Sequence, residues 1–425
     1  MSHKICMIGL GYVGLPLAVE FAKHFSVIGF DIKQDRIDEL NLGHDNTLEV
    51  EDDNLQSVLM VEMPKDKGMY LTSKLDEIRD CNIYIVTVPT PVDKNNRPDL
   101  TPLIKASETI GKVIKKNDIV IYESTVYPGC TEEDCIPVIE QTAGMKLNVD
   151  FYAGYSPERI NPGDKEHTVT TIHKVTSGST PEIAEVVDQL YKRVIKAGTH
   201  KAPSIRVAET AKVIENSQRD INIAFVNELA RICAHMNLDT RSVLDAASTK
   251  WNFLKFSPGL VGGHCIGVDP YYIAQKAQEV GYHPEIILAG RRMNDGMGAW
   301  VAAQIVKLMI KKNLPVNHAP VLVLGVTFKE NCPDVRNTKV VDVVNELRQF
   351  GCKVDIYDPW ANKADVKHEY GEELIEKYNL ENYTTIVLAV SHREFLKIDF
   401  SKRKKESVLY DIKALLPIEM VDGRL

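Results

Sequence analysis

The chain has 425 residues, 44% of them hydrophobic and 26% charged, which is the composition of a folded protein with two or three domains. Its formal net charge of −8 argues against a general nucleic-acid binder, because such proteins usually present a basic face. An anionic small-molecule substrate is compatible with this charge, since a binding site needs only a few local Lys and Arg residues.

The N-terminal residues predict a strand, a glycine-rich turn and a helix. The apolar run 4–8 is followed by Gly9-Leu10-Gly11-Tyr12-Val13-Gly14 and the helical stretch 15–22, and a second strand, 27–30, ends at Asp31. A G-x-G-x-x-G sequence between strand and helix, with an acidic residue about 20 positions further on, predicts a dinucleotide-binding Rossmann unit.

Each position of this turn has an expected role in holding NAD. Gly9 makes the tight turn, Gly11 lets the pyrophosphate approach the backbone, and Gly14 allows close packing of helix on strand. Backbone N–H groups at the helix N-terminus, around Tyr12 and Val13, are expected to meet the phosphates.

Two residues bear on the choice between NAD and NADP. Asp31 can accept hydrogen bonds from a ribose 2′-hydroxyl and would repel a 2′-phosphate, so NAD is favoured. Arg36 either weakens that preference slightly or lies on the adenine side of the cofactor.

Two further buried-type strands, 82–88 and 118–122, end in small hydroxylated residues or proline. Ligands of an open parallel sheet bind beyond the carboxyl ends of its strands. We therefore expect Thr90 and Thr125 to line the cofactor cleft, whereas Ser124 is expected only to cap the next helix.

A polar loop, 156–164, follows the next predicted strand and contains Glu158. Glu158 either holds a water molecule, as a base or a hydrogen-bond acceptor, or is a solvated loop charge. From the residues alone the two interpretations carry equal weight.

The stretch 208–236 contains neither proline nor glycine and predicts one long helix that joins two domains. Lys212 and Asn216, one turn apart, are candidates to donate hydrogen bonds to a reacting oxygen. They belong to a polar stripe along the helix, which consists of Glu209, Lys212, Asn216, Asp220 and Asn227. The opposite stripe is apolar enough to meet a partner helix, which indicates a homodimer.

The stretch 256–270 frames Cys265 with glycines and places Asp269 four residues later. A lone cysteine is more often a small buried hydrophobe, but glycine lets a ligand approach the main chain, so we expect a nucleophilic thiol here. The eight cysteines are scattered through a chain without a signal peptide or an apolar run of about 20 residues, which favours reduced thiols in a cytoplasm and no membrane association. Cys130 and Cys135 lack a matching second pair, so no metal site is expected.

The rest of the chain predicts a second helical stretch, 271–312, and then a second α/β unit. The strands expected in this unit are 319–326, 352–359, 385–390 and 408–411, with a helix over 339–350. The unit lacks a G-x-G-x-x-G sequence, yet Lys329 and Arg336 follow its first strand, where a second nucleotide could lie. The expected fold class is α/β, with two Rossmann-like doubly wound parallel sheets joined by the long helix and a helical dimerisation region.

Several motifs follow one another in an order that resembles a known family. They are Gly-Leu-Gly-Tyr-Val-Gly-Leu-Pro, Glu-Ser-Thr-Val, Ser-Pro-Glu-Arg, the Lys212–Asn216 helix, Gly-Gly-His-Cys with Asp269, and Phe-Lys with Asp-Val-Arg-Asn-Thr. Over essentially its whole length the chain resembles the UDP-glucose/GDP-mannose dehydrogenase family. The resemblance implies an NAD-binding Rossmann domain over 1–200, a central helical dimerisation domain with the cysteine loop over 201–312, and a UDP-sugar-binding domain over 313–425.

The chemistry implied by this resemblance is a four-electron oxidation of the C6 hydroxyl of a UDP-sugar to a uronic acid. Cys265 would bind the aldehyde as a thiohemiacetal, a second NAD would oxidise it to a thioester, and water would release the carboxylate. The other catalytic residues implied, which would stabilise oxyanions, hold a water and assist proton transfer and hydrolysis, are Lys212, Asn216, Asp269, Thr125 and Glu158. The substrate-binding residues implied are Glu158, Arg159, Lys212, Asn216, Phe256, Gly259, Gly262 and Lys329. Arg336 would join the residues that bind the cofactor.

Two positions depart from the family pattern. Where a second glutamate commonly follows the first by four residues, this chain has Pro162, so hydrolysis is expected to rely on Glu158 without that neighbour. Where a lysine often precedes Asp269, this chain has Val268. The loop sequence resembles the branch that acts on UDP-N-acetylhexosamines in Vi-type capsule and O-antigen synthesis. UDP-N-acetylglucosamine or its galacto epimer is therefore preferred to UDP-glucose, and the manno epimer is placed behind both.

Two other classes of function stay open. A two-electron NAD dehydrogenase of the hydroxyacid type would need no cysteine, so Cys265→Ser or Cys265→Ala would still convert substrate to acid. A non-catalytic NAD-binding scaffold would bind NAD without reducing it in the presence of any UDP-sugar. The glycine-framed cysteine and the polar helix stripe both count against the scaffold.

Overall fold

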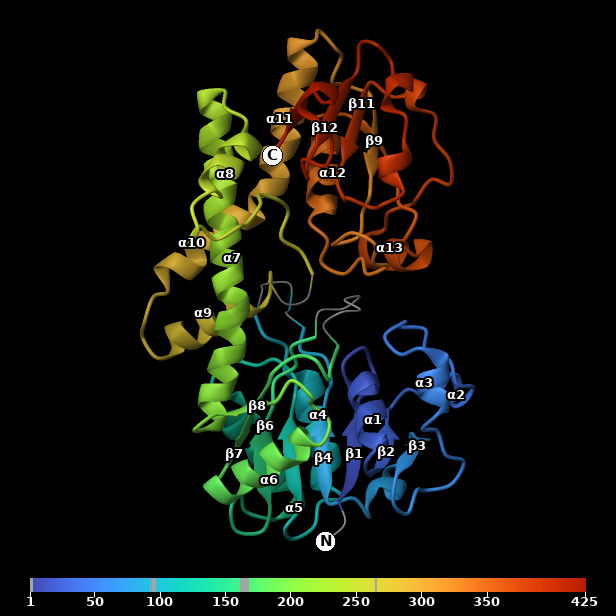
Figure 1. Ribbon diagram of the computed structural model, residues 1–425, viewed down its shortest axis with the longest axis vertical. Helices are drawn as coiled ribbons and strands as arrows, with labels where there is room; N and C mark the ends of the chain where they lie inside the picture. The colour runs from blue at the N-terminus through green and yellow to red at the C-terminus, as the bar shows by residue number, and fades with distance from the viewer. Residues whose placement is uncertain (1–2, 92, 94–96, 161–167, 264–265) are drawn as a thin grey trace. The chain divides into compact units, whose positions relative to one another are not determined.

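The computed structural model describes residues 3–91, 93, 97–160, 168–263 and 266–425. The chain folds as two compact units, one formed by residues 1–215 with 271–281 and the other by residues 216–270 with 282–425. Each unit is built around a β-sheet on which helices pack (Figure 1).

The sheet of the first unit has, within the described residues, eight strands in the order β3-β2-β1-β4-β5-β6-β7-β8. They are β1 (Lys4–Ile8), β2 (Ser26–Phe30), β3 (Gly68–Thr72), β4 (Ile83–Val86), β5 (Ile119–Tyr122), β6 (Tyr152–Tyr155), β7 (Lys174–Gly178) and β8 (Thr199–Lys201). The central strands are apolar runs buried on both faces, as expected for a parallel sheet covered by helices on both sides. Neighbouring strands are parallel except that β7 runs antiparallel to β6, a reversal that the sequence analysis did not predict.

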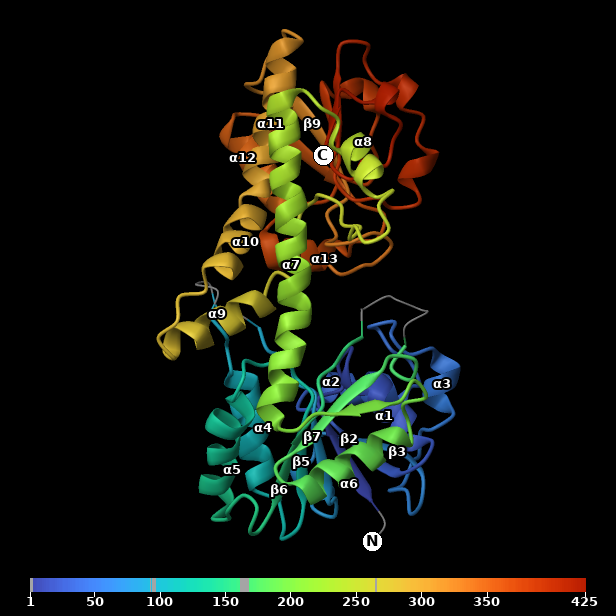
Figure 2. The ribbon, with the colours of Figure 1, turned by 60° about the vertical axis from the view of Figure 1, so that its left-hand side comes forward.

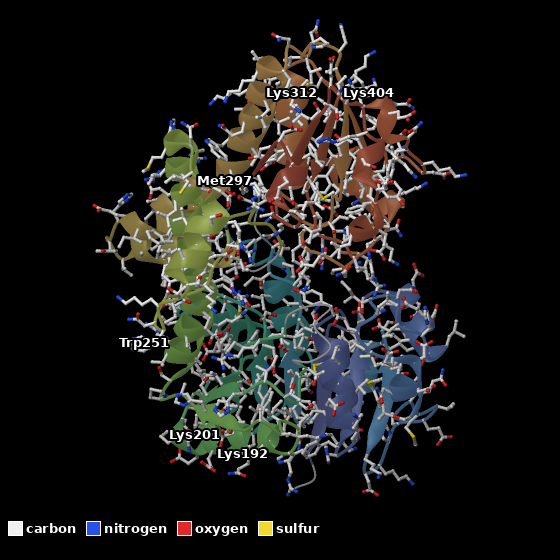
Figure 3. All side chains as sticks on the ribbon, turned by 45° about the horizontal axis from the view of Figure 1, so that its top comes forward. Lys192, Lys201, Trp251, Met297, Lys312 and Lys404 are labelled. Atoms are coloured by element: carbon white, nitrogen blue, oxygen red, sulfur yellow. The ribbon has the colours of Figure 1, made fainter. Side chains whose placement is uncertain are left out.

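The helices of this unit connect its strands. They are α1 (Gly14–Ala22), α2 (Gln34–Asn41), α3 (Asp52–Gln56), α4 (Thr101–Gly111), α5 (Ile136–Ala143) and α6 (Pro181–Lys192), with the short turns η1 (Leu75–Ile78) and η2 (Thr131–Cys135). Thr180 caps α6 by accepting the N–H of Ile183, and a proline at the first helical position suits this helix start. Lys192, in the last turn of α6, lies at the surface of the unit (Figure 3) and pairs with Asp188 at 2.6 Å.

Helix α7 (Ile205–Met236) has 32 residues, which corresponds to about 48 Å at a rise of 1.5 Å per residue. It begins three residues before the predicted start and ends at the predicted residue. The division between the two units falls within it, after Glu215. Most of the polar stripe predicted from the sequence is buried, since Glu209, Lys212, Asp220 and Asn227 are all less than 8% exposed. These polar side chains are therefore in the interior, where each needs a partner.

The second unit contains a five-stranded sheet in the order β10-β9-β11-β12-β13, parallel throughout its described strands. The strands are β9 (Pro320–Leu324), β10 (Lys353–Tyr357), β11 (Thr385–Leu388), β12 (Val408–Asp411) and β13 (Gly423–Arg424). The helices of this unit are α8 (Thr240–Ala247), α10 (Glu285–Asp295), α11 (Met297–Lys311), α12 (Val340–Gln349) and α13 (Lys363–Tyr370), with short turns at Leu380–Asn382, Phe395–Lys397, Phe400–Lys402 and Ile418–Met420. Helices α11 and α12 lie side by side and contribute valines, isoleucine and methionine to the core behind the sheet (Figure 2).

The prediction of one helical stretch over 271–312 is wrong in one respect, because the stretch is not a continuous helix. Three helices occupy it, namely α9 (Asp269–Glu279), α10 and α11. Gly281, with a φ of 84°, follows α9, and Pro284, which has no N–H to donate, precedes α10. Gly296 separates α10 from α11. The predicted fold class, α/β with two Rossmann-like sheets, is confirmed.

Candidate functional site

The glycine turn of the first unit lies between β1 and α1, where the sequence predicts it. The Gly9 N–H donates to the carbonyl of Phe30 at 2.9 Å, and the Thr87 hydroxyl donates to the Gly9 carbonyl at 2.7 Å. A Cβ added at Gly14 would lie 1.9 Å from the Gly9 oxygen, so only glycine permits this close packing of the helix on the strand. A Cβ added at Gly11 would meet nothing within 4 Å, and this open space in front of the N-terminus of α1 fits a pyrophosphate.

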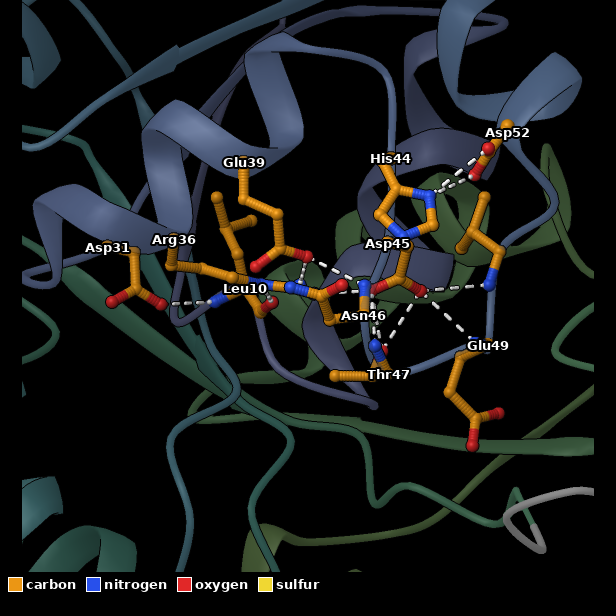
Figure 4. Close-up of polar contacts among 11 residues, drawn as sticks. Leu10, Asp31, Arg36, Glu39, His44, Asp45, Asn46, Thr47, Glu49 and Asp52 are labelled. Atoms are coloured by element: carbon orange, nitrogen blue, oxygen red, sulfur yellow. Dashed lines mark hydrogen bonds and ion pairs between the residues drawn. The ribbon is translucent and has the colours of Figure 1, made fainter. Parts of the chain in front are cut away.

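Asp31 lies at the end of β2 beside this turn. Its Oδ2 accepts the N–H of Leu10 at 2.9 Å (Figure 4). Its Oδ1 accepts the N–H of Lys33 at 3.0 Å. Each carboxylate oxygen can accept a further hydrogen bond, so the side chain is oriented and still able to hold a ribose hydroxyl.

Arg36 is engaged within the protein through all three of its guanidinium nitrogens. Nε donates to the Leu10 carbonyl at 3.0 Å, and the two terminal nitrogens pair with Glu39 and Asp45 at 2.7 Å each (Figure 4). Burial acts to raise the pKa of Asp45, but hydrogen bonds from Thr47 and Arg36 outweigh it and lower the pKa overall, which keeps this carboxylate charged. Arg36 therefore braces the turn, and a 2′-phosphate would have to compete with two carboxylates for it. The residues of this site fit NAD.

Thr90 and Thr125 follow adjacent parallel strands, so they lie at the same edge of the sheet. The Thr90 carbonyl accepts the hydroxyl of Tyr272, on the part of α9 that belongs to this unit, at 2.8 Å. The expectation that Ser124 caps a helix is wrong, because no helix begins there. The Ser124 hydroxyl instead donates to the Val88 carbonyl at 2.6 Å and ties the end of β5 to the end of β4.

Glu158 follows β6 and is only 9% exposed, which overturns the interpretation as a solvated loop charge. Its Oε1 accepts the N–H groups of Arg159 and Ile160, each at 2.5 Å, and its Oε2 lies 3.5 Å from the ammonium of Lys174. Arg159 donates to the His173 carbonyl at 2.7 Å and pairs with Glu215, so it is held in the same neighbourhood.

A second buried carboxylate, Glu123, lies next to Glu158. Glu123 pairs with Lys174 and accepts the hydroxyl hydrogen of Tyr191, and its side chain is fully buried. Burial raises the pKa of Glu123 to about 7, although Lys174 opposes the shift. The Glu123–Lys174 pair could not be found from sequence periodicity, because the partners come from strands that are not consecutive.

Two residues predicted to act together, Asn216 and Asp269, are in contact in the second unit. The Asn216 amide donates to Asp269 Oδ2 at 2.5 Å, and Asp269 is 2% exposed. An amide donor on a buried carboxylate fixes its orientation. Lys212, one helical turn before Asn216, is 7% exposed.

Cys265 and His264 lie outside the described residues, as does Pro162, but both flanks of the cysteine loop are described. On the side that precedes the cysteine, the Asn227 side chain binds the backbone of Gly259 through its amide oxygen and its amide nitrogen. On the same side the Gly263 N–H donates to the Asn337 carbonyl at 3.2 Å, and the Asn337 side chain donates to the Gly263 carbonyl at 2.9 Å. A Cβ at Gly262 would lie 2.5 Å from the Asn337 carbonyl oxygen, so glycine is required for this close approach.

A cavity of about 240 Å³ lies in the second unit beside the start of this loop. Phe256, predicted to bind substrate, lines it together with the cations Arg241, Lys255 and Lys413. A Cβ at Gly259 would lie 3.7 Å from the Lys413 ammonium. Gly259, which the resemblance implies to be a substrate-binding residue, is therefore next to this cation. The three cations were not singled out from the sequence, because they come from segments far apart in the chain.

Lys329 and Arg336 follow β9 as predicted. The Lys329 ammonium lies 5.6 Å from the centre of the Phe328 ring, and Arg336 forms a two-point pair with Asp334 at 2.8 and 3.0 Å. Arg336 and Asp334 line a separate cavity with Asp365, so the structure places Arg336 in acidic surroundings.

At the end of β10, the position that corresponds to Asp31 in the first sheet, stands Asp358. It accepts the N–H groups of Val326 and Thr327 at 2.7 and 3.1 Å, and His392, fully buried, contacts it at 3.1 Å. Burial acts to raise the pKa of Asp358, but His392 and the backbone donors lower it overall. The carboxylate of Asp358 therefore forms its hydrogen bonds with groups inside the second unit.

The dinucleotide turn of the first unit fits NAD, and the cavity of the second unit carries cations that suit an anionic ligand. Comparison with known proteins gives the family. Models of the UDP-glucose/GDP-mannose dehydrogenase family match residues 3–195 (NAD binding domain), 206–296 (central domain) and 322–417 (UDP binding domain). The chain belongs to this family and is an NAD-dependent nucleotide-sugar dehydrogenase.

Individual relatives are similar over their whole length. The chain is 60% identical to a UDP-N-acetyl-D-glucosamine 6-dehydrogenase of Pseudomonas aeruginosa, covering 99% of each chain. It is 56% identical to a protein of the same name from Salmonella typhi, covering 99% of this chain and 98% of the relative. Among solved structures, the UDP-D-ManNAc dehydrogenase of Pyrococcus horikoshii has a TM-score of 0.88 at 28% identity and covers 99% of this chain and 98% of that one.

No group of three or more His, Cys, Asp or Glu side chains in the described ranges is arranged to hold a metal ion. Every helix in the described part of the chain is too short or too polar to span a bilayer.

Proposed function

We propose that this protein oxidises the C6 hydroxyl of UDP-N-acetyl-D-glucosamine to the carboxylate, with two molecules of NAD. The observation that carries the proposal is 60% identity, across both full lengths, to a relative that bears this activity in its name. The galacto epimer is the second candidate, because the Ser-Pro-Glu-Arg loop by which the branch was predicted does not contain a residue specific for either epimer. UDP-N-acetylmannosamine enzymes are more distant, at about 30% identity.

The first oxidation needs a bound alcohol, a proton acceptor and a hydride acceptor, and NAD supplies the last of these. The turn from Gly9 to Gly14 and the carboxylate of Asp31 hold the cofactor. On the substrate side, we assign Lys212 and Asn216 as donors to the reacting oxygen. Two observations support this assignment: both residues lie on α7 one turn apart, and Asn216 contacts Asp269.

The second oxidation needs a covalent adduct on the sulfur of Cys265. The thiol adds to the C6 aldehyde to form a thiohemiacetal, and loss of a second hydride and a proton from that adduct leaves a thioester. Water then forms a bond to C6 while the C–S bond breaks, which returns the thiol and releases the carboxylate. The balance is one alcohol, two NAD⁺ and one water giving one carboxylate, two NADH and three protons. Support comes from the segment that precedes Cys265, whose backbone is fixed by Asn227 at Gly259 and by Asn337 at Gly263.

Hydrolysis of the thioester is assigned to Glu158, with Thr125 assisting proton transfer. Support comes from the burial of Glu158 and from the hydrogen bonds that fix one of its oxygens, since a base must be oriented before it can accept a proton from water.

The nucleotide part of the substrate is assigned to the cavity in the second unit. Lys255 and Lys413 offer positive charge that matches a diphosphate, and Phe256 offers an apolar wall. Arg241 is paired with Asp245 of the same lining at 2.9 Å. Lys329 is assigned to the sugar and Arg336 to the cofactor by family resemblance. The three-part division at 1–200, 201–312 and 313–425 is proposed with them and is supported by the family-model segments.

The assembly proposed is a homodimer through α7. Apolar side chains that are 46–61% exposed recur along this helix at Val207, Ile214, Phe225, Ile232 and Met236. Spacings of four, seven and eleven residues place them on one face, and such a stripe is expected to be covered by a partner helix. A cytoplasmic location is proposed because the seven described cysteines are free thiols.

Purified protein with NAD and a panel of UDP-sugars tests the function. Two NADH per sugar and the best kcat/KM with UDP-N-acetylglucosamine are expected. A preference for the galacto epimer would replace the substrate assignment. One NADH per sugar with accumulating aldehyde, or full acid formation by Cys265→Ser, would contradict the thioester route. NAD binding without any NADH would favour a scaffold.

A further inference from the structure

Lys174 is a nearly fully buried lysine in the first unit, 3% exposed, and was not among the predicted site residues. It is the first residue of β7. Because β7 runs antiparallel to β6, its first residue lies at the edge of the sheet where β5 and β6 end. Thr125 and Glu158 lie at that edge. The antiparallel direction of β7 therefore places the ammonium of Lys174 next to Glu158, the carboxylate proposed to assist hydrolysis.

The ammonium of Lys174 lies between two carboxylates. It is paired with Glu123 and lies 3.5 Å from Glu158 Oε2. Tyr191 donates its hydroxyl hydrogen to the other oxygen of Glu123, and the Lys174 ammonium lies 5.6 Å from the centre of the Tyr191 ring. A buried ammonium is tolerated only when it is paired and hydrogen-bonded, and these contacts meet that condition.

Glu158 is restrained at its backbone and at both side-chain oxygens. Its N–H donates to the Glu123 carbonyl at 3.1 Å, and Oε1 accepts the N–H groups of Arg159 and Ile160. Oε2 is the oxygen that faces Lys174. Without the ammonium, two buried carboxylates would repel each other across this edge, and Oε2 would lose its fixed direction.

We propose that Lys174 is a positioning residue for thioester hydrolysis, in which it fixes the carboxylate of Glu158 while Glu123 and Tyr191 hold the ammonium in place. The inference rests on the proposed function. Glu158 takes the proton of the attacking water as the C–O bond forms and the C–S bond to Cys265 breaks, and Lys174 neither gives nor takes a proton. Glu123, which follows a neighbouring strand, is the second carboxylate that contacts the same ammonium.

Lys174→Met, which keeps the length and removes the charge, tests the assignment in the full-length protein with NAD and the UDP-sugar that the wild type prefers. Steady-state turnover is expected to fall by about 10- to 100-fold, because a small displacement of a catalytic group has effects of this size. The first-turnover burst of NADH is expected to persist, and intact-mass analysis should show a sugar adduct on the protein. In a Glu158→Gln background, Lys174→Met should lower turnover by less than about 2-fold, since residues that act through one another are not additive.

Two companion variants keep the test decisive. Tyr191→Phe removes only the hydroxyl that holds Glu123 and should give the same pattern with a smaller loss, of about 3-fold, even if Lys174→Met does not fold.

Asp188→Asn is the matched control. Asp188 is a buried residue of α6 that accepts the hydroxyls of Thr176 and Thr199 at 2.8 and 2.6 Å, and it contacts neither carboxylate. Its variant should lower thermal stability without changing the ratio of burst to steady-state rate.

Three results would overturn the inference. Losses that multiply in the Lys174→Met/Glu158→Gln double variant would show that the two residues act independently. A burst reduced in proportion to turnover, in Lys174→Met or in Tyr191→Phe, would show a structural effect alone. A wild type that reduces no NAD with any UDP-sugar would remove the proposed function itself and the inference with it, and this outcome is recognised before any variant is measured.

Discussion

Asn227 binds Gly259 at both backbone groups: the Gly259 N–H donates to Asn227 Oδ1 at 2.8 Å, and Asn227 Nδ2 donates to the Gly259 carbonyl at 3.0 Å. The same amide donates to Asn294 Oδ1 at 2.8 Å, and Asn227 is fully buried. A side chain of α7 thus fixes the start of the cysteine loop. Asn227 belongs to the predicted polar stripe, and its role is to hold this loop.

Replacing Asn227 with alanine should therefore disturb both stability and the reactive thiol. The variant leaves a buried N–H and a buried carbonyl of Gly259 without partners, which costs about 2–4 kcal/mol of unfolding free energy. Urea unfolding measures the loss, and the rate at which iodoacetamide modifies Cys265 should change because the loop is released. Asn222→Ala is the control on the same helix, since the Asn222 side chain donates only to a carbonyl one turn earlier, that of Gln218. Equal effects of the two variants would argue against a loop clamp.

Asp31→Ala should weaken NAD binding and reduce the preference for NAD over NADP. The carboxylate is aligned by the Leu10 N–H and can accept bonds from the ribose, so its loss should raise the KM for NAD by about tenfold, or about 1.4 kcal/mol. The KM for the UDP-sugar should not change. An unchanged ratio of the kcat/KM values for NAD and NADP would rule out this role. Asp35→Ala, an exposed acid on the neighbouring helix, serves as the control.

Removing cations from the cavity of the second unit should affect the nucleotide sugar and not NAD. Lys255→Ala and Lys413→Ala are each expected to raise the KM for the UDP-sugar, and the inhibition constant of UDP, by about 10-fold, since charge-assisted contacts to phosphate are worth about 1.5–3 kcal/mol. Lys404→Ala, at an exposed lysine that does not line this cavity, is the charge-matched control. If UDP inhibition were unaffected in both cavity variants, the diphosphate would have to bind elsewhere.

Two buried glutamates should make the protein less stable as the pH rises through neutrality. Burial raises the pKa of Glu123 to about 7, and burial also raises the pKa of Glu209, which holds the N–H groups of Gly129 and Thr131, to about 7. A carboxyl group whose pKa is higher in the folded state contributes stability that is fully present below its unfolded pKa and is lost as the pH rises through its folded pKa. The unfolding free energy should therefore fall between about pH 5 and pH 8, by on the order of 3 kcal/mol for each group.

Urea unfolding of the wild type and of Glu209→Gln at pH 5.5 and pH 8 would check this. The variant cannot ionise, so its unfolding free energy should decrease less over this range. Glu228→Gln, an exposed position on the same helix, should keep the wild-type slope. A wild-type unfolding free energy that rises from pH 5.5 to pH 8 would contradict the assignment of both groups.

The N-terminal half of the site could be predicted because its signal is local. Gly9, Gly14 and Asp31 stand at spacings that only a strand–turn–helix unit explains, and the structure places them accordingly. The reversal of β7 could not be predicted, because nothing in the residues of a short buried strand fixes its direction relative to a neighbour. Lys174 was missed for that reason.

The α7 stripe shows a second limit of sequence reasoning. Its polar residues were grouped by periodicity, and in the structure Asn216 contacts Asp269. The same periodicity does not distinguish Asn216 from Asp220 and Asn227, which belong to the same stripe. Asp220 pairs with Arg291 and Asn294 within the second unit. Partners contributed by distant segments decide whether a buried polar side chain does chemistry or supports the fold.

The two sheets treat the acid after their second strand in opposite ways. Asp31 faces a glycine turn with open space, whereas Asp358 is enclosed by His392 and the backbone of Val326 and Thr327. Of these two described acids, Asp31 alone stands beside open space that a ribose could occupy. Under the proposed chemistry the two NAD⁺ molecules therefore use the same site one after the other. The first NADH leaves and a second NAD⁺ binds while the sugar remains covalently attached to the protein. The lifetime of this covalent adduct, rather than a second cofactor pocket, links the two oxidations.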